Sequence, residues 1–480
     1  MIAFRNERDS LGELEIPQDA YWGVHTARAK QNFSITGQTV ARVPELIAAL
    51  ANVKWAAAVT NRSLGLLDDK KAAAIAGACA EIVGGGLHDQ FVIDVIQGGA
   101  GTSTNMNANE VIANRALEIL GYPKGDYSVL SPLDDVNRSQ STNDVYPTAV
   151  KLALVAAINS YVLELGQLRS AFEDKAVEFA EVVKMGRTQL QDAVPMTLGR
   201  EFGGFAVTLG EDIERLLEVV PLLCEVNLGA TAIGTGITAE PGYAEAVCRT
   251  LAELTGLPIR LAPDLVEATS DVGVFMQASA MLKRSAVKLS KICNDLRLLS
   301  SGPQLGLGEI RLPARQAGSS IMPGKVNPVI PEVVSQIAYV VIGTDATVTA
   351  AAEAGQLQLN AFEPVMAHSL FQGFDWMERA CVTLRINCIV GIEANEEKLR
   401  RDVAGSVGVI TALIPHIGYA RAAQIAKAAL ADGRTVGELV LESGLVGQEA
   451  LNELLAPRVL AGLVQAAEGP ALESEFKVTQ

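Results

Sequence analysis

Residues 318–327 read Gly318-Ser319-Ser320-Ile321-Met322-Pro323-Gly324-Lys325-Val326-Asn327. The two glycines and the proline predict a loop, because glycine admits backbone angles that other residues avoid and proline lacks an N–H. This loop also holds two hydroxyls, one ammonium and one amide. Asn327-Pro328 predicts the N-cap and first turn of a helix, and an anion is favoured just ahead of such a helix terminus. Composition alone favours an ordinary helix–helix connection.

The literal string, continued to Pro328, resembles the signature loop of the aspartase/fumarase superfamily. Its members are homotetrameric lyases that make or consume fumarate. The resemblance runs over essentially the whole chain and implies a mainly α fold of three domains, with a central bundle of long helices that assembles into a tetrameric bundle core. The implied domains are an N-terminal, mainly helical domain at 1–140, the long-helix bundle at 141–395 and a small C-terminal helical domain at 396–480.

Length and charge restrict the class of protein. The chain has 480 residues, more than one ordinary domain, and its hydrophobic fraction is 49% with only 5% aromatic residues. This composition suits long helices that pack closely. The formal net charge of −16 argues against a nucleic acid partner, because phosphate binding needs a basic surface. A small dianionic substrate would therefore need a locally positive or donor-rich site.

The N-terminal residues and the cysteines indicate the compartment. Residues 1–10 are charged and lack the apolar segment of a secretory signal, and we expect no membrane-spanning helix. The six cysteines have no metal-ligand or disulfide-framework spacing, so we expect buried free thiols. A cytoplasmic enzyme is the simplest interpretation.

Apolar residues recur at steps of three and four from residue 149 to about 185, which predicts a long helix. Comparable patterns follow at about 200–227, 272–300, 328–355 and 365–393. Helices of this length are expected to pack side by side at shallow angles. Residues 338–342 and 350–354 are apolar or small beyond one stripe, so we expect self-association. Residues 1 to about 40 are predicted to be an irregular arm, and residues from about 396 onward to form short helices.

Three further stretches gather hydroxyl and amide side chains close to predicted helix ends. They are residues 97–110, 134–148 and 184–196. The glycines of the first suggest a nucleotide loop, but no Gly-Lys-Ser/Thr follows and no strand pattern precedes it. From the residues alone, the first stretch is a glycine-rich helix start capped by Thr and Asn, and Thr188 and Gln189 of the third could simply end and restart helices. Helix capping would explain only one or two of the polar residues in the second stretch. All three resemble regions of the superfamily, and residues 97–110 are closer to aspartases than to fumarases.

The resemblance also implies roles for individual residues. Ser319 is implied to be the catalytic base. The implied substrate-binding residues are Arg28, Thr102, Ser141, Thr142, Asn143, Thr188, Gln189, Ser320, Lys325 and Asn327. Arg28 follows a stretch similar to the aspartase sequence YxGVHTxRA, and on residue type alone a surface arginine is equally consistent.

Gln189 discriminates between branches of the superfamily. Fumarases carry histidine at the corresponding position, whereas many bacterial aspartases carry glutamine, and residues 227–236 also resemble aspartases. The implied activity is that of a carbon–nitrogen lyase, the reversible deamination of L-aspartate to fumarate and ammonia. It would proceed by base-catalysed β-elimination through an aci-carboxylate. Asp135 stands where fumarases often have a histidine of a secondary carboxylate site, which argues against that site here.

Three alternatives remain open from the sequence: a class II fumarase, a lyase for N-substituted aspartates, and a non-catalytic scaffold of the same fold. Argininosuccinate and adenylosuccinate lyases fit less well. No organic cofactor motif and no metal-ligand spacing is found, and a divalent cation such as Mg²⁺ as activator is a trait of the family rather than of these residues. The expected partners are a small dicarboxylate or amino-acid substrate and three further copies of the chain, with active sites shared by three subunits, and neither nucleic acid nor membrane.

Overall fold

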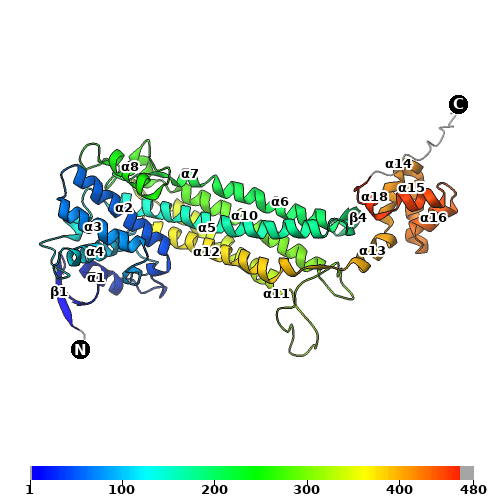
Figure 1. The fold of residues 1–480 in the computed structure, drawn as a ribbon, viewed down its shortest axis with the longest axis horizontal. Coiled ribbons are helices and arrows are strands. Elements are labelled where there is room, and N and C mark those ends of the chain that lie inside the picture. The colour runs from blue at the N-terminus through cyan, green and yellow to red at the C-terminus, as the bar shows by residue number, and fades with distance from the viewer. Residues whose placement is uncertain (1–2, 465–480) are drawn as a thin grey trace. The chain divides into compact units, whose positions relative to one another are not determined.

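The structure, a computed structural model, describes residues 3–464, and the chain forms two compact units (Figure 1). Unit 1 combines Met1–Leu165, Asp212–Val287 and Gln336–Arg379, and unit 2 combines Gly166–Glu211, Lys288–Ser335 and Ala380–Gln480. These units group the residues differently from the three sequence ranges given above. The three-domain organisation stays a prediction.

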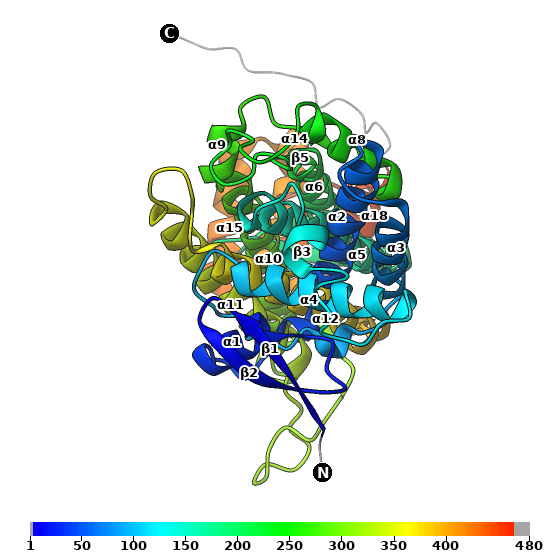
Figure 2. The same ribbon diagram turned by 90° about the vertical axis from the view of Figure 1, so that its left-hand side faces the viewer.

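The N-terminal arm of unit 1 is regular, so the prediction of an irregular segment was wrong. Strands β1 (Phe4–Asp9) and β2 (Gly12–Pro17) form an antiparallel hairpin, and helix α1 (Val24–Asn32) follows. Figure 2 shows the hairpin beside α1. The Arg5 guanidinium donates to the carbonyls of Pro17, Gln18, Ala20 and Trp22 at 2.8–3.2 Å. One side chain therefore ties the hairpin to the segment that leads into α1, a tertiary cause that periodicity does not reveal.

Unit 1 also holds shorter helices from two separate parts of the chain. It contains α2 (Pro44–Ser63), α3 (Asp69–Val83), α4 (Thr102–Ile119), α8 (Tyr243–Thr255) and α9 (Leu265–Ser270), with short turns η1 (Val40–Arg42), η2 (His88–Gln90) and η3 (Pro132–Val136). Helix α2 begins with proline in its first turn and is rich in alanine, which allows close packing against α3 and α8. Two residues of each of β5 (Glu225–Val226) and β6 (Arg260–Leu261) pair in parallel.

Five long helices confirm the periodicity of the sequence. They are α5 (Thr142–Glu178), α6 (Leu198–Leu217), α10 (Gly273–Leu299), α11 (Val329–Glu353) and α12 (Glu363–Asn387). Within unit 1, Tyr161 of α5 packs edge-on against Phe374 of α12 and hydrogen-bonds Ser285 of α10 at 2.7 Å. Within unit 2, Phe172 of α5 contacts Phe202 and Phe205 of α6. The mainly helical fold is thus confirmed.

Two predicted helix ends are corrected. Helix α5 ends at Glu178, and residues up to 185 instead enter strand β3 (Val183–Thr188), which pairs with β4 (Gln191–Thr197). Helix α6 ends at Leu217 rather than at about 227, and a separate turn, α7 (Val220–Leu223), starts with Pro221 near its beginning. Proline favours a break at this point because it lacks the N–H that would bond the carbonyl four residues earlier.

The C-terminal part of unit 2 has the short helices that the sequence predicts. They are α13 (Glu396–Gly405), α14 (Ile414–Ile417), α15 (Tyr419–Asp432), α16 (Val436–Glu442), α17 (Gln448–Leu454) and α18 (Pro457–Leu460), with η4 (Ile389–Gly391) before α13 and η5 (Val407–Leu413) between α13 and α14. Their buried apolar residues form one cluster that also includes Val183 and Met185 of β3. Strands β7 (Ile310–Arg311) and β8 (Glu393–Ala394) pair antiparallel.

The cysteines and the apolar helices bear on two further predictions. All six cysteines are buried free thiols, as predicted. By length and composition alone, α5 and α11 could cross a membrane, and one or two such helices are weak evidence for a membrane span. Core helices of water-soluble proteins pass the same test, and 56% of the tested window of α5 is buried. Length and composition therefore do not decide between the two kinds of helix.

Candidate active site

The first group of predicted site residues lies in unit 1, where α4 and α5 begin. Gly101 precedes α4 with φ at 87°, and a Cβ atom there would lie 2.4 Å from the Tyr146 ring of α5. Only glycine therefore allows this approach. Thr102 is the first residue of α4; its side chain is exposed and its Oγ1 donates to the carbonyl of Gly99 at 2.7 Å.

Asp144 fastens a second segment of the group to the start of α5. Its fully buried carboxylate accepts backbone N–H bonds from Ser141 at 3.0 Å, Gly229 at 3.1 Å and Thr231 at 2.9 Å. Burial raises the pKa of Asp144 to about 6, against the lowering effect of these donors. The glycine-rich turn at 227–236 is thereby held beside Ser141, Thr142 and Asn143.

A proline inside α5 strengthens this attachment. Pro147 lacks the N–H that would bond the carbonyl of Asn143 four residues earlier. The side-chain amide of Asn227 donates to that carbonyl at 3.0 Å instead. The Asn143 amide in turn donates to the carbonyl of Ala232 at 2.8 Å. Two reciprocal side-chain bonds thus join α5 to the turn.

Sequence reasoning missed a set of buried amides behind Thr142. Asn105 of α4 donates to Thr142 Oγ1 at 3.1 Å and to Asn137 Oδ1 at 3.3 Å, and the same oxygen accepts from Lys54 of α2 at 2.8 Å. Asn105 and Lys54 occupy positions of apolar helical stripes, and both are at most 1% exposed. A polar residue on the buried face of a helix was the available signal.

The second group lies in unit 2, and its first part is the β3–β4 hairpin. Thr188 ends β3, and Gln189 and Leu190 form a two-residue turn with φ at 53° and 63°. Both central residues of a type I′ turn need positive φ, which is strained for residues other than glycine, asparagine and aspartate. At the base of the hairpin, buried Glu309 pairs with Lys184 at 2.7 Å and with Arg187. The hairpin therefore presents Thr188 and Gln189 to solvent on a rigid support.

The signature loop is closed at its neck. The Gly318 N–H donates to the carbonyl of Lys325 at 2.8 Å, and the Asn327 side-chain amide donates to the carbonyl of Gly318 at 2.8 Å. The loop itself is confirmed. The prediction that Asn327 caps the next helix was wrong, because its amide holds the loop and α11 starts at Val329.

Ser319 has a specific environment within this loop. Its Oγ accepts backbone N–H bonds from Ile321 at 3.2 Å and Met322 at 3.1 Å. Two donors at one hydroxyl oxygen favour negative charge on that oxygen. Ser320 and Lys325 are exposed, and Lys325 forms no ion pair with any residue between 3 and 464. Its ammonium is free to meet an anion.

Arg28 and Asp135 both have partners within unit 1. Arg28 binds Asp9 of β1 with two bonds of 2.7 and 2.8 Å and donates to the carbonyl of Gly12 at 3.1 Å. This bond holds the pKa of Asp9 below its usual range. Asp135 accepts two bonds of 2.9 Å from Lys71 of α3. The guanidinium of Arg28 is thus engaged by the hairpin, and the charge of Asp135 is neutralised.

Comparison with known proteins identifies the family of this chain. The family model described as Lyase matches residues 12–343, and the one described as Fumarase C C-terminus matches residues 409–462. The chain belongs to the aspartase/fumarase superfamily. The resemblance of the signature loop is thereby confirmed.

Three relatives from the superfamily cover nearly the whole chain. The aspartate ammonia-lyase of Pseudomonas aeruginosa is 58% identical over 454 residues, which are 94% of this chain and 96% of that protein. A solved structure from Brucella melitensis, described as fumarate lyase:delta crystallin bound to cobalt, has a TM-score of 0.93 at 57% identity and covers 96% of this chain and 100% of its own. The class II fumarase of Schistosoma mansoni has a TM-score of 0.89 at 34% identity, with coverages of 96% and 99%. The fold is confirmed, and the roles of individual residues stay predictions.

Proposed function

We propose that this chain is an aspartate ammonia-lyase, a carbon–nitrogen lyase that converts L-aspartate reversibly to fumarate and ammonia. The observation that carries the proposal is the closed signature loop, in which two backbone N–H groups meet Ser319 Oγ. It stands in a chain that is 58% identical to an enzyme of that name. The fumarase among the relatives is more distant, at 34% identity.

The chemistry requires donors around one carboxylate. The hydrogen removed is next to the β-carboxylate and is very weakly acidic, so the carbanion must be held as an aci-carboxylate with two negative charges on its oxygens. Hydrogen-bond donors fixed before the reaction stabilise such charge. Thr102, Ser141, Thr142 and Thr188 are the proposed donors. Thr102 is the first residue of α4 and Thr142 the first residue of α5, with Ser141 directly before it.

Ser319 is the proposed base. A serine alkoxide is strongly basic and needs stabilisation, which the N–H groups of Ile321 and Met322 supply. The alkoxide takes the β-hydrogen as a proton, and the C–H electron pair moves into the aci-carboxylate. This pair then forms the double bond of fumarate as the C–N bond breaks, and the nitrogen leaves with its electron pair as ammonia. The two flanking glycines suit a loop that closes over substrate.

The remaining predicted residues orient the substrate. Lys325, Asn327 and Ser320 are proposed to hold the α-carboxylate, with Lys325 supplying positive charge. Asn143 and Gln189 are proposed to orient the amine, which needs no histidine acid because ammonia leaves readily. Arg28 is proposed as a substrate-binding residue whose guanidinium is positioned by Asp9.

Assembly and cofactors complete the proposal. The two groups of residues belong to different units, and we propose a homotetramer in which three subunits form each active site. Exposed apolar residues of α11, including Tyr339 and Ile342, support association. A cytoplasmic location is proposed, and no organic cofactor. Among the described residues no group of three His, Cys, Asp or Glu side chains fits a metal ion, so no step uses one, and Mg²⁺ as an activator stays a proposal.

The test is substrate choice. Fumarate formation, followed by ultraviolet absorbance, is expected with L-aspartate and not with L-malate. An N-substituted aspartate serves as the third substrate. Activity on malate alone would make the chain a fumarase, activity only on the substituted amine would make it a sibling lyase, and silence with all three substrates would favour a scaffold.

A further inference from the structure

Lys54 is a fully buried cation in the middle of α2. Its side chain is 0% exposed, and its Nζ donates to Asn137 Oδ1 at 2.8 Å. The titratable groups that act on it are Asp144 of α5 and Cys79 of α3. Burial lowers the pKa of Lys54 to about 7, although the Asp144 carboxylate raises it. A buried ammonium without an adjacent carboxylate is costly, so its position needs an explanation.

The chemistry of lysine fixes the orientation of Asn137. An ammonium has three donors and no acceptor, so Asn137 must turn its oxygen towards Lys54. Its Nδ2 then donates to the carbonyl of Gln140 at 3.2 Å. The same Oδ1 accepts from Asn105 Nδ2 at 3.3 Å and from Asn109 Nδ2 at 3.1 Å. The ammonium form of Lys54 and the Gln140 carbonyl together therefore set the direction of three amide groups.

The orientation of these amides also determines the hydrogen bond of Thr142, a predicted site residue. Asn105 Nδ2 also donates to Thr142 Oγ1 at 3.1 Å. A hydroxyl has one proton to donate, and a threonine that accepts from Asn105 keeps its own proton for another acceptor. The Oδ1 atoms of Asn105 and Asn109 have no hydrogen-bond partner within residues 3–464. The orientation of both amides therefore follows from Asn137 and not from their own oxygens.

We propose that Lys54 is a positioning residue that acts through Asn137 and Asn105 to make Thr142 a hydrogen-bond donor to the substrate carboxylate. The inference rests on the proposed function, in which Thr142 is one of the donors to the aci-carboxylate. Without Lys54, only the Gln140 carbonyl still favours this orientation of the Asn137 amide, so a half-turn that reverses the chain of bonds becomes less costly. Thr142 would then donate back to Asn105 and be lost to the substrate.

The variant Lys54→Met tests this role, since it removes the ammonium and keeps an apolar side chain of similar length. Two inhibitors separate positioning from general damage. The nitronate of 3-nitropropionate has the charge and planarity of an aci-carboxylate, whereas succinate resembles the ground state. We expect kcat on L-aspartate and nitronate affinity each to fall about 100-fold, and succinate affinity to fall less than about threefold.

Two further variants provide a matched control and an independent test. Lys151→Met removes another buried lysine of unit 1, which donates to the carbonyl of Glu225 at 2.8 Å, and is the matched control. It is expected to bind both inhibitors with an unchanged ratio. Asn105→Ala cuts the last bond to Thr142 while leaving Lys54 near Asp144, so it tests the chain of bonds even where Lys54→Met does not fold. A smaller selective loss of nitronate affinity is expected, because the Thr142 hydroxyl is then no longer held by a donor and can donate to a nearby backbone carbonyl instead.

Both affinities are measured by calorimetry on purified protein, without turnover. Equal weakening of nitronate and succinate in Lys54→Met and Asn105→Ala would overturn the proposal, as would a Lys151→Met variant with the same selective loss. A wild-type protein that binds nitronate tightly but does not convert L-aspartate would contradict the proposed function instead, and the binding ratios would still decide the role of Lys54.

Discussion

At the scale of single residues, unit 1 buries three carboxyl groups whose pKa values are raised by burial: Glu363 to about 8, Glu110 to about 7 and Asp144 to about 6. Glu110 and Asp144 each accept three backbone N–H bonds, which explains why their carboxylates belong in the interior. Glu363, in the first turn of α12, is 3% exposed, and Lys151 is the cation that acts on it. It is the carboxyl group for which ionisation is most unfavourable.

Glu363→Gln should therefore change how stability depends on pH. The folded pKa of about 8 lies above the unfolded value of 4.5, so between these values the folded protein holds a proton that the unfolded chain releases. Wild-type stability then falls as pH rises, by up to about 1.4 kcal/mol per pH unit from this group, and glutamine does not titrate. In urea unfolding between pH 5 and 8, the free energy of unfolding of Glu363→Gln should rise relative to that of the wild type as pH rises. Exposed Glu240→Gln is the control, and parallel curves for Glu363→Gln and wild type would contradict the assignment.

At the scale of elements, periodicity predicted the five long helices within a few residues at most ends, because the recurrence of apolar residues at steps of three and four is a local pattern. The β3–β4 hairpin was missed because its turn lacks the glycine or asparagine that signals a type I′ turn. The polar residues of the signature loop and of residues 137–143 could be predicted as site residues from the sequence motifs that contain them. The bonds of Lys54 and Arg5 could not, because their partners lie far away in sequence or are backbone carbonyls.

The hairpin turn gives a prediction for stability. Leu190 has φ at 63° and is 70% exposed, so its side chain contributes little burial while its Cβ is strained. Leu190→Gly should stabilise the protein by about 0.5–1 kcal/mol relative to Leu190→Ala, since alanine keeps the Cβ. Thermal unfolding of the two variants measures the difference. A glycine variant that melts at or below the alanine variant would show that the turn is not strained.

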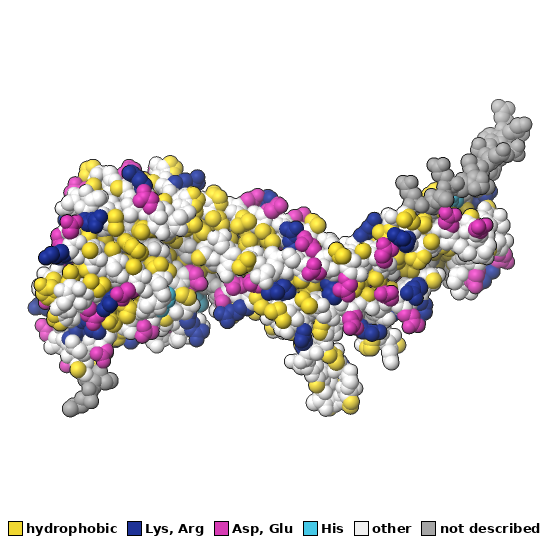
Figure 3. Space-filling model, viewed as in Figure 1, with side chains coloured by type: hydrophobic (Ala, Val, Ile, Leu, Met, Phe, Trp, Pro, Cys, Tyr) yellow, Lys and Arg dark blue, Asp and Glu magenta, His cyan; other side chains and the backbone are white. Residues whose placement is uncertain are grey.

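At the scale of the whole molecule, α11 combines an apolar sequence with an exposed surface. Its most apolar window is only 28% buried, and Tyr339, Val340 and Ile342 are 57%, 43% and 42% exposed. On the face shown in Figure 3, hydrophobic side chains are likewise exposed between charged ones.

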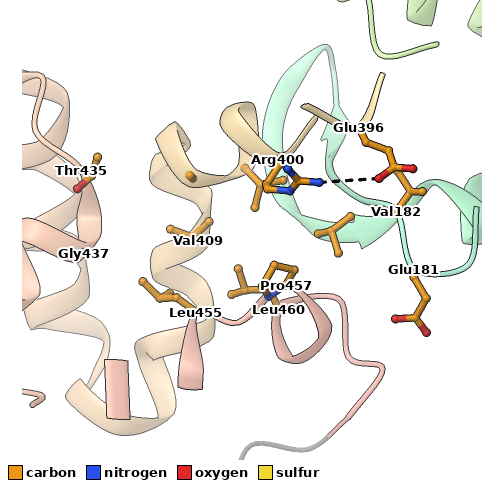
Figure 4. Close-up of a pocket in the computed structure, with 13 residues that line it drawn as sticks. Glu181, Val182, Glu396, Arg400, Val409, Thr435, Gly437, Leu455, Pro457 and Leu460 are labelled. Atoms are coloured by element: carbon orange, nitrogen blue, oxygen red, sulfur yellow. Dashed lines mark ion pairs between the residues drawn. The ribbon is translucent and has the colours of Figure 1, made fainter. Parts of the chain in front are cut away.

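A second apolar feature, a cavity of about 360 Å³ in unit 2, lies beside α13 with the Glu396–Arg400 ion pair among its lining (Figure 4). Exposed apolar side chains grouped on one helix are typical of an interface, and we propose that α11 forms that interface.

Tyr339→Glu should therefore weaken assembly and activity together. A carboxylate in the centre of an apolar interface must be desolvated or must keep the subunits apart. Light scattering should show a smaller mass than that of the wild-type protein, for which we propose a tetramer, with fumarate formation reduced in proportion to the assembly lost. Thr347→Glu places the same charge at an exposed polar position of α11 and is the control. A monomeric Tyr339→Glu protein with full activity would contradict an active site shared between subunits.

The most direct test of the central claim is fumarate formation from L-aspartate by wild type and Ser319→Ala, with folding checked by circular dichroism. Wild type should form fumarate, and the variant should retain the fold and lose at least about 1,000-fold in kcat, because alanine has no oxygen to accept the β-proton. A Ser319→Ala protein that deaminates L-aspartate at the wild-type rate would contradict the account, since the base would then lie elsewhere.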